Sequence, residues 1–232
     1  TDAMDVFDLP YLFTSNEEAR QGLSGEAAQG QLDALESAGF KGINYWENGM
    51  YAIGSTKEVN SLEELQGMRI RSIDSTLQTD IYNALGAMPV VLAWGDIYTS
   101  LQQNVIDAVS STTITNMYTS NFYEVAPYII RSNHGYSPAP LLCNLNLWNS
   151  LPADIQELVM ECANEARDYH YQVCDEQLAE YQKTMEENGA TFIDVDLDEW
   201  IAAVQPVYDK YVGDGGIDPA LVEAIQADAG IA

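Results

Sequence analysis

The sequence predicts an α/β protein organised around a parallel sheet. In the central part of the chain, short apolar runs of strand length alternate with segments whose apolar residues recur at helical spacing. The strand-like runs cover residues 68–72, 88–92 and 105–109, and the helical segments cover residues 74–85 and 97–101. Alternation of this kind builds a parallel sheet with helices on its faces, and ligands bind such sheets at the carboxyl ends of the strands.

The chain before this unit predicts one helix and two strands. Asn16 is suited to cap a helix that continues to about residue 38 and ends at Gly39. Residues 41–47 are predicted to form a strand, and Gly49 permits a bend before a second short strand at residues 50–54.

The longest predicted element is a helix over residues 151–188. Its apolar positions keep one face over residues 155–173 and then continue on a rotated face over residues 178–185. This rotation indicates either a helix that changes the surface it packs against near residues 175–177, or an ordinary kinked core helix.

Shorter elements complete the prediction. They are extended segments at 125–131 and 135–146, a strand at 191–195, and helices at 198–211 and 218–227. Because no repeat, low-complexity run or proline-rich linker separates two domains, any two lobes are expected to be intertwined through strands.

Composition and charge exclude several classes of partner. The chain has 232 residues, of which 47% are hydrophobic, and this is enough for a sizeable core. No apolar run reaches the roughly 20 residues that a membrane span needs. Thirty-six acidic and nine basic residues give a net charge of −27, which argues against nucleic acid or an anionic membrane as a partner. The acidic surface is interpreted as a solvated, self-repelling one, with a basic docking partner as the alternative.

Motifs for catalysis and for metal binding are absent from the sequence. It has no nucleophile elbow, zinc-protease motif, phosphate loop or dinucleotide turn, and its three cysteines lack zinc-site spacing. His134 and His170 fall in different elements, and His134 is interpreted as a structural hydrogen-bonding residue. We therefore predict no enzyme activity, no cofactor and no metal.

Arg71 is the strongest candidate for binding an anion. In a field this negative, an anionic ligand needs a local, dehydrated cation with two-pronged geometry, which a guanidinium supplies. Among the five arginines, Arg71 lies nearest to the carboxyl end of a predicted central strand. The alternative is that Arg71 forms an ion pair with a nearby carboxylate such as Asp74.

Three blocks of sequence carry a family resemblance. They are GMRIRS, LGAMPVVLAWGDIYTSLQQNVIDA and NFYEVAPYIIRSNHGY, and the similarity continues from VFDLPYLF to LPADIQ over nearly the whole chain. In this order the blocks resemble the solute-binding proteins of tripartite ATP-independent periplasmic (TRAP) transporters, the DctP family.

The resemblance implies a periplasmic-binding-protein-like fold of two intertwined lobes with hinge strands and a long helix across both. Residues 1–48 with 137–176 would form lobe I, and residues 49–136 with 177–232 would form lobe II. It also implies that Thr1 lies inside a longer protein, so that the N-terminal strands of lobe I are missing from this chain.

The resemblance also implies roles for individual residues. Arg71 would form a two-pronged salt bridge with the ligand carboxylate, and Trp94 would pack over the ligand, although an aromatic residue in such a loop can also be core packing. The family often has a second arginine where this chain has Tyr51, and an asparagine where it has Ser111. Hydroxyl groups of Tyr51 and Ser111 are expected to donate hydrogen bonds instead.

Asp74 and Asn48 complete the expected binding residues. The expected ligand is a small organic anion with one carboxylate, or a sulfonate, and with a small or partly apolar remainder. The expected partners are the membrane subunits of a TRAP transporter, and the protein is expected to be a monomer in the periplasm or outside the cytoplasm, free or lipid-tethered. The alternatives are a ligand-binding component of a sensory system and an enzyme acting on a small organic acid.

Overall fold

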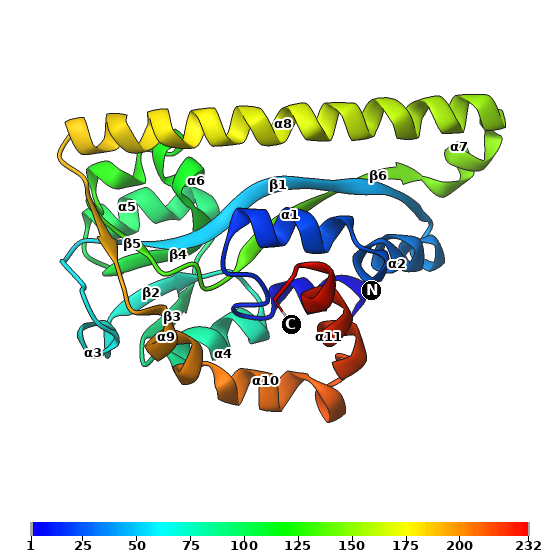
Figure 1. The fold of residues 1–232 in the computed structure, drawn as a ribbon. Helices are drawn as coiled ribbons and strands as arrows, with labels where there is room; N and C mark the ends of the chain where they lie inside the picture. Colours follow the sequence, from blue (N-terminus) through cyan, green and yellow to red (C-terminus); the bar gives the residue numbers. More distant parts are fainter. Residues whose placement is uncertain (1, 232) are drawn as a thin grey trace.

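A seven-stranded mixed sheet runs through the computed structural model, which describes residues 2–231 (Figure 1). The strand order is β3-β2-β4-β1-β5-β7, and β6 pairs with β1 outside this path. The strands are β1 (Phe40–Ser55), β2 (Arg69–Ser72), β3 (Met88–Val91), β4 (Ala108–Thr113), β5 (Tyr128–Arg131), β6 (Tyr136–Asn144) and β7 (Thr191–Asp194). Strands β2, β3 and β4 are parallel to one another, as are β5 and β7, whereas β1 is antiparallel to all its neighbours. The predicted α/β class is confirmed.

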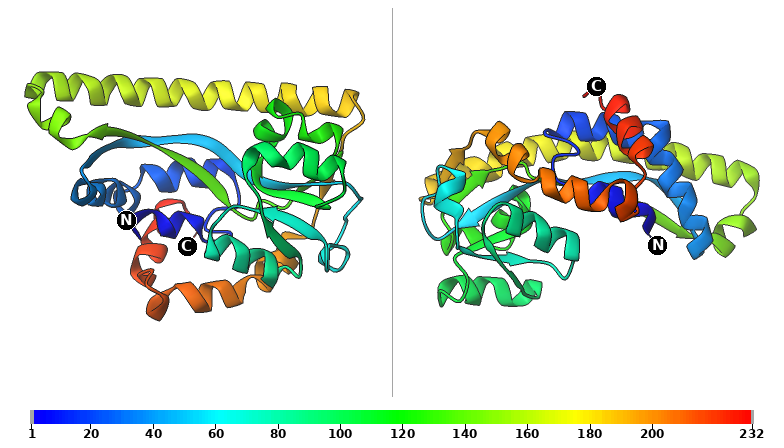
Figure 2. Two further views of the ribbon diagram at one scale, coloured as in Figure 1. Left: turned by 180° about the vertical axis from the view of Figure 1, so that it is seen from behind. Right: turned by 90° about the horizontal axis from the view of Figure 1, so that it is seen from below.

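Helices cover both faces of this sheet (Figures 1 and 2). The α-helices are α1 (Asn16–Ser24), α2 (Glu26–Ala34), α3 (Leu62–Leu65), α4 (Thr76–Ala84), α5 (Ile97–Gln102), α6 (Ile114–Thr119), α7 (Leu145–Ser150), α8 (Ala153–Glu187), α9 (Leu197–Ala203), α10 (Gln205–Tyr211) and α11 (Pro219–Asp228). The 3₁₀ helices are η1 (Asp2–Asp8), η2 (Leu35–Ala38), η3 (Trp94–Asp96), η4 (Phe122–Glu124) and η5 (Gly213–Gly215).

The strand–helix–strand unit predicted in the central part is present. Strand β2 pairs in parallel with β3 and with β4, and α4 buries Leu77 and Ile81 against the core. The third strand differs from the prediction, because β4 begins at Ala108 rather than at residue 105 and continues to Thr113. Residues 110–112 therefore lie within a buried strand and not in a loop after it.

Strand β1 is long and pairs with different strands along its length. Its first part pairs with β6 from Phe40 to Met50, and its last residues pair with β4 and β5. The prediction of two separate strands is wrong: Gly49, with a φ of 107°, lies at a register irregularity in the pairing with β6 and bends the strand without ending it.

Two predicted helices are each divided in the structure. The helix expected over residues 16–38 is interrupted at Gly25, where the chain is extended and passes so close to Asp228 of α11 that a side chain would not fit. The helix expected over residues 198–211 is divided into α9 and α10, because Pro206 in the first turn of α10 cannot donate the hydrogen bond that would continue α9.

Helix α8 has 35 residues and runs along the length of the molecule, where it contacts β1 and α6 (Figures 1 and 2). The rotated apolar face is confirmed at Met185, which is fully buried, and at Tyr181, whose ring stacks on Tyr118 at 4.2 Å. The first predicted face is largely open: Leu158 is 50% exposed and Tyr169 is 68% exposed, because no described element covers it.

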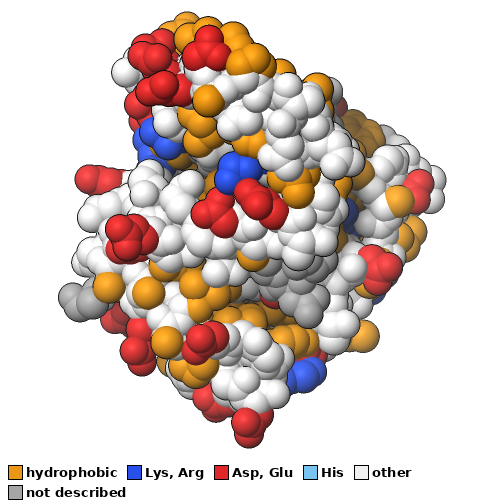
Figure 3. Space-filling view, turned by 90° about the vertical axis from the view of Figure 1, so that its right-hand side faces the viewer, with side chains coloured by type: hydrophobic (Ala, Val, Ile, Leu, Met, Phe, Trp, Pro, Cys, Tyr) orange, Lys and Arg blue, Asp and Glu red, His pale blue; other side chains and the backbone are white. Residues whose placement is uncertain are grey.

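The surface carries acidic side chains in dispersed positions. Figure 3 shows them across one end of the molecule, with few basic groups among them, and this agrees with the net charge of −27. Within residues 2–231, no helix is both long enough and apolar enough to span a membrane.

Candidate functional site

Arg71 lies near the carboxyl end of β2 and is only 4% exposed. Its guanidinium group donates hydrogen bonds from Nε to the carbonyl oxygen of Leu92 at 3.2 Å and from Nη1 to that of Ser110 at 3.3 Å. These carbonyls belong to the chain just after β3 and to β4, the two strands that flank β2. The sheet edge therefore fixes the orientation of the guanidinium through neutral backbone groups, and burial lowers the pKa of Arg71.

No carboxylate compensates the charge of Arg71 within the described part of the chain. All nine lysine and arginine side chains lie in residues 2–231. The other eight each have a carboxylate oxygen within 4.0 Å; they are Arg20, Lys41, Lys57, Arg69, Arg131, Arg167, Lys183 and Lys210. The alternative, an ion pair between Arg71 and Asp74, is wrong. Asp74 is exposed and makes no ion pair with a described residue. Arg71 therefore carries a positive charge that no described carboxylate pairs.

Trp94 covers one side of this guanidinium. It begins η3, after β3, and its ring centroid lies 5.6 Å from Cζ of Arg71. The other contact of the indole is Phe122, at 5.1 Å between ring centroids, yet the residue is still 42% exposed. Trp94 is therefore partly a packing residue and partly an open apolar surface beside the cation.

Tyr51 approaches Arg71 from β1. Its ring packs on Gly135, where a Cβ atom would lie 2.8 Å from it, and against the ring of His134 at 5.7 Å. Its hydroxyl group interacts with Ser137, and the residue lines a cavity of about 170 Å³ together with Ser137 and Asp8. Burial raises the pKa of Tyr51, the Asp8 carboxylate raises it further, and Ser137 and Arg71 act in the opposite direction.

A buried network of uncharged side chains supports the strand behind Arg71. The Tyr82 hydroxyl lies 2.7 Å from Ser111 Oγ, and Ser111 Oγ donates to Gln78 Oε1 at 3.2 Å. His134 Nε2 lies 2.9 Å from Ser110 Oγ, and its Nδ1 lies 2.7 Å from Ser132 Oγ. Burial lowers the pKa of His134 to about 3, so the imidazole is neutral. The structural role predicted for His134 agrees with these contacts.

Ser111 belongs to this network. Its hydroxyl is already shared with Tyr82 and Gln78, and its backbone has a φ of 52°, a left-handed conformation that is uncommon for serine. The sequence analysis did not identify Tyr82 or Gln78. Their only signal is two polar groups four residues apart on α4, next to the apolar residues Leu77 and Ile81.

Asn48 lies away from Arg71. It donates from Nδ2 to Ser137 Oγ at 3.2 Å, and it lines a different cavity of about 260 Å³, whose other walls include Cys174 and Leu178 of α8. The structure thus places Arg71, Trp94 and Tyr51 close together. Ser111 joins them through its neighbour Ser110, which contacts Arg71. Within the described part of the chain, neither Asn48 nor the exposed Asp74 makes a hydrogen bond or an ion pair with Arg71.

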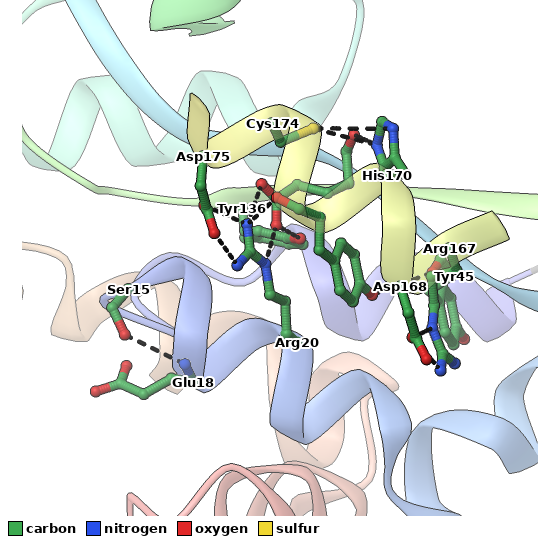
Figure 4. A network of polar contacts seen from close by, with 12 residues as sticks. Ser15, Glu18, Arg20, Tyr45, Tyr136, Arg167, Asp168, His170, Cys174 and Asp175 are labelled. Atoms are coloured by element: carbon green, nitrogen blue, oxygen red, sulfur yellow. Dashed lines mark hydrogen bonds and ion pairs between the residues drawn. The ribbon is translucent and has the colours of Figure 1, made fainter. Parts of the chain in front are cut away.

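A charged network lies where β1 passes α8 (Figure 4). Glu47, whose side chain is 3% exposed, accepts hydrogen bonds from Nε of Arg20 at 2.6 Å and from Nη2 at 2.9 Å. Arg20 also pairs with Asp175 of α8, and the Tyr136 hydroxyl donates to Glu47 at 3.2 Å. These contacts connect α1, β1, β6 and α8.

A cavity with a volume of about 450 Å³ lies beside the loop that follows β2. Ser75 and Thr76 at the start of α4 form one wall, and Asp8 of η1 forms part of another. Asp8 therefore faces both this cavity and the smaller one lined by Tyr51.

Sequence comparison gives relatives of one kind. The C4-dicarboxylate-binding periplasmic protein DctP of Rhodobacter capsulatus is 30% identical over 210 residues, which are 89% of this chain and 63% of that protein. The 2,3-diketo-L-gulonate-binding periplasmic protein YiaO of Escherichia coli K12 is 28% identical over 196 residues, 84% of this chain and 59% of that protein. The chain spans about three fifths of the length of these curated relatives.

Solved structures agree with these relatives. A TRAP periplasmic solute-binding protein of Xanthobacter autotrophicus Py2 with bound β-D-galacturonate matches with a TM-score of 0.88 and 27% identity, over 98% of this chain and 75% of that chain. One of Shewanella oneidensis with bound succinate matches with a TM-score of 0.88 and 26% identity, over 99% of this chain and 75% of that chain. The model of the DctP family, bacterial extracellular solute-binding protein family 7, matches residues 1–214. This chain belongs to the DctP family of bacterial extracellular solute-binding proteins.

Proposed function

We propose that this protein captures a small organic anion with one carboxylate, or a sulfonate, and delivers it to the membrane subunits of a TRAP transporter. A single observation supports this most directly: Arg71 is buried at a sheet edge and has no described carboxylate partner, whereas each of the other eight cations has one. An unpaired buried charge is costly, and a ligand carboxylate would compensate it.

The binding geometry follows from the groups that hold the guanidinium. Nε and Nη1 of Arg71 face backbone carbonyls, so its remaining N–H groups are available for two parallel hydrogen bonds to a carboxylate. The open side of Trp94 offers an apolar surface for the rest of the ligand. Tyr51 stands where the family resemblance implies a second arginine, and this supports a ligand with one negative group.

Closure of two lobes would bury this salt bridge. The proposed lobes are residues 1–48 with 137–176, and residues 49–136 with 177–232. Support comes from β1 and β6, whose pairing shifts register between Glu47 and Gly49, opposite Pro138 and Ser137. Bending at residues 46–49 and 134–137 would move the lobes together around the ligand, while α8 adjusts across both.

The site of action is inferred from the family. We infer that the protein acts in the periplasm or outside the cytoplasm, free or lipid-tethered, as a monomer, and that it releases its ligand chemically unchanged. Incubation of the protein with a bound acid for several hours, followed by mass spectrometry of the acid, checks the last point. Any conversion of the acid that depends on the protein contradicts it.

Replacement of Arg71 tests the proposal. In calorimetric titration of the natural full-length protein with a panel of small carboxylates and sulfonates, Arg71→Ala is expected to weaken binding by at least about 30-fold, because it removes the cation of a buried pair. Arg71→Lys, which keeps the charge but not the two-pronged geometry, should fall between Arg71→Ala and the wild type.

The matched control is Arg167→Gln. Arg167 forms an ion pair with its neighbour Asp168 on α8 and lies over the ring of Tyr171 at 6.0 Å, so this change removes one positive charge without touching the sheet edge. Its ligand affinity should equal that of the wild type. Equal binding by the wild type and Arg71→Ala would contradict the role of Arg71.

A further inference from the structure

Asp8 is an acidic side chain that shares a cavity with Tyr51 of the candidate site. It ends η1, and it lines the cavity of about 170 Å³ with Tyr51 and Ser137 as well as the cavity of about 450 Å³ with Ser75 and Thr76. Its side chain is half-buried, and it makes no hydrogen bond or ion pair with the residues that the structure describes. The half-buried Asp8 carboxylate is therefore only partly hydrated, and no described residue donates a hydrogen bond to it or forms an ion pair with it.

The Tyr51 phenol connects Asp8 with Arg71 electrostatically. It interacts with the Asp8 carboxylate and with the Arg71 guanidinium, which have opposite effects on its pKa. Burial raises the pKa of Asp8, and the neighbouring Asp5 raises it further. Tyr51 is therefore close enough to feel both the Arg71 cation and the Asp8 carboxyl group, neither of which has a described partner of opposite charge.

Each of the two groups favours a different end of a ligand. Arg71 favours an anion, whereas a carboxylate at Asp8 accepts hydrogen bonds and repels a second negative charge. This repulsion is stronger in a closed, dehydrated cleft than in water. Specificity of this type comes as much from rejecting the wrong ligand as from binding the right one.

We propose that Asp8 is a specificity-determining residue, and that the cleft takes an acid with one carboxylate at Arg71 and a hydrogen-bond donor, a hydroxyl or a protonated nitrogen, at Asp8. This inference rests on the proposed function, and it narrows the ligand from small organic anions in general to donor-bearing monocarboxylates. Tyr51 and Ser137 provide neutral hydroxyls in the cavity that Asp8 lines. Dicarboxylates are rejected because their second carboxylate faces Asp8.

Two series of acids that differ only at the far end test this preference. The four-carbon series is 4-hydroxybutyrate, 4-aminobutyrate, butyrate and succinate, and the six-carbon series is 6-hydroxyhexanoate, 6-aminohexanoate, hexanoate and adipate. In calorimetric titration of the natural full-length protein, the hydroxy or amino acid of at least one series should bind about tenfold or more tightly than the alkyl acid and the dicarboxylate of the same length. The hydroxy and amino members separate the two kinds of donor.

Asp8→Asn keeps the size of the side chain and removes its charge. We expect succinate or adipate to bind about tenfold more tightly to this variant than to the wild type. We expect 4-aminobutyrate or 6-aminohexanoate to bind more weakly to the variant than to the wild type. Asp154→Asn, an equal change of charge in the exposed first turn of α8, should leave all affinities unchanged.

The outcomes separate this inference from the proposed function. If the dicarboxylate binds the wild type as well as the donor-bearing acid, or if Asp8→Asn keeps the wild-type order, the role of Asp8 is wrong while the role of Arg71 stands. If no acid binds the wild type, both fail. Because the order of affinities in the wild type is informative by itself, the test does not depend on whether the variant folds.

Discussion

At the scale of residues, the buried and neutral His134 next to the candidate site makes the free energy of unfolding depend on pH. His134 is fully enclosed, contacts Ser110, Ser132 and Tyr82, and has a pKa lowered to about 3. An unfolded chain would protonate the same imidazole near pH 6.5. Between these values the unfolded state holds one proton more than the folded state, so the free energy of unfolding decreases as the pH falls below about 6.5.

Replacement of His134 should reduce this dependence on pH. His134→Asn is expected to flatten the decrease of the free energy of unfolding between pH 6.5 and 5, by up to about 1.4 kcal/mol per pH unit relative to the wild type. Urea denaturation at several pH values measures it, and His170→Gln, the change at the other histidine, serves as the control. The same slope in His134→Asn and in the wild type would mean that the buried ring is protonated in the folded state.

At the scale of elements, one ion-pair network connects the long helix to the strand that bends. Arg20 of α1 holds Glu47 of β1 and Asp175 of α8, while Tyr136 of β6 contacts Glu47 (Figure 4). The Glu47 carboxylate lies next to the register shift at Gly49. Removing Arg20 leaves this carboxylate buried without its cation, a change that costs about 3–5 kcal/mol in comparable pairs.

Arg20→Ala is therefore expected to lower the free energy of unfolding by about 3 kcal/mol, and Glu47→Gln in the same chain should restore part of the loss, because the neutral amide has no charge to compensate. A double-mutant cycle in urea measures the coupling. Arg167→Gln, which leaves the exposed carboxylate of Asp168 and not a buried one without its cation, should cost less than about 1 kcal/mol. An Arg20→Ala loss as small as that of Arg167→Gln would show that the network does not hold these elements together.

At the scale of the whole molecule, the net charge opposes the ligand that the site favours. A charge of −27 repels an anion at long range, whereas Arg71, in the role proposed for it, would attract the anion only at close range. Salt screens charges that lie more than about 8–10 Å apart in solvent, and it acts much less on a buried pair. Approach and binding should therefore respond differently to ionic strength.

The association rate constant of a carboxylate ligand is expected to rise with salt, by several-fold between about 10 mM and 150 mM, while the dissociation rate constant changes little. Stopped-flow measurement of tryptophan fluorescence at increasing sodium chloride concentration follows both constants, with Trp94 as a reporter next to Arg71. A falling association rate constant would indicate that a local positive field dominates the approach.

Periodicity and strand ends were enough to predict the central strand–helix–strand unit, the long helix and the position of Arg71. The continuity of β1 was not predictable, because Gly49 permits either a bend or a break, and pairing with β6, β4 and β5 keeps the strand intact. The exposure of the first predicted apolar face of α8, which includes Leu158 and Tyr169, was also missed. An apolar stripe shows what a helix could bury but not whether another element covers it.

By itself, the sequence determined the α/β class, the net negative charge and the place of Arg71 near the carboxyl end of a strand, because spacing and composition are local properties of a chain. Only the tertiary structure decided that Arg71 has no described carboxylate partner, that Tyr82 and His134 enclose the strand beside it, and that Asp8 faces Tyr51. The hydrogen bonds among these features join residues 24 to 39 positions apart, and several elements together enclose the buried groups. Such contacts carry no signature in the local order of the residues.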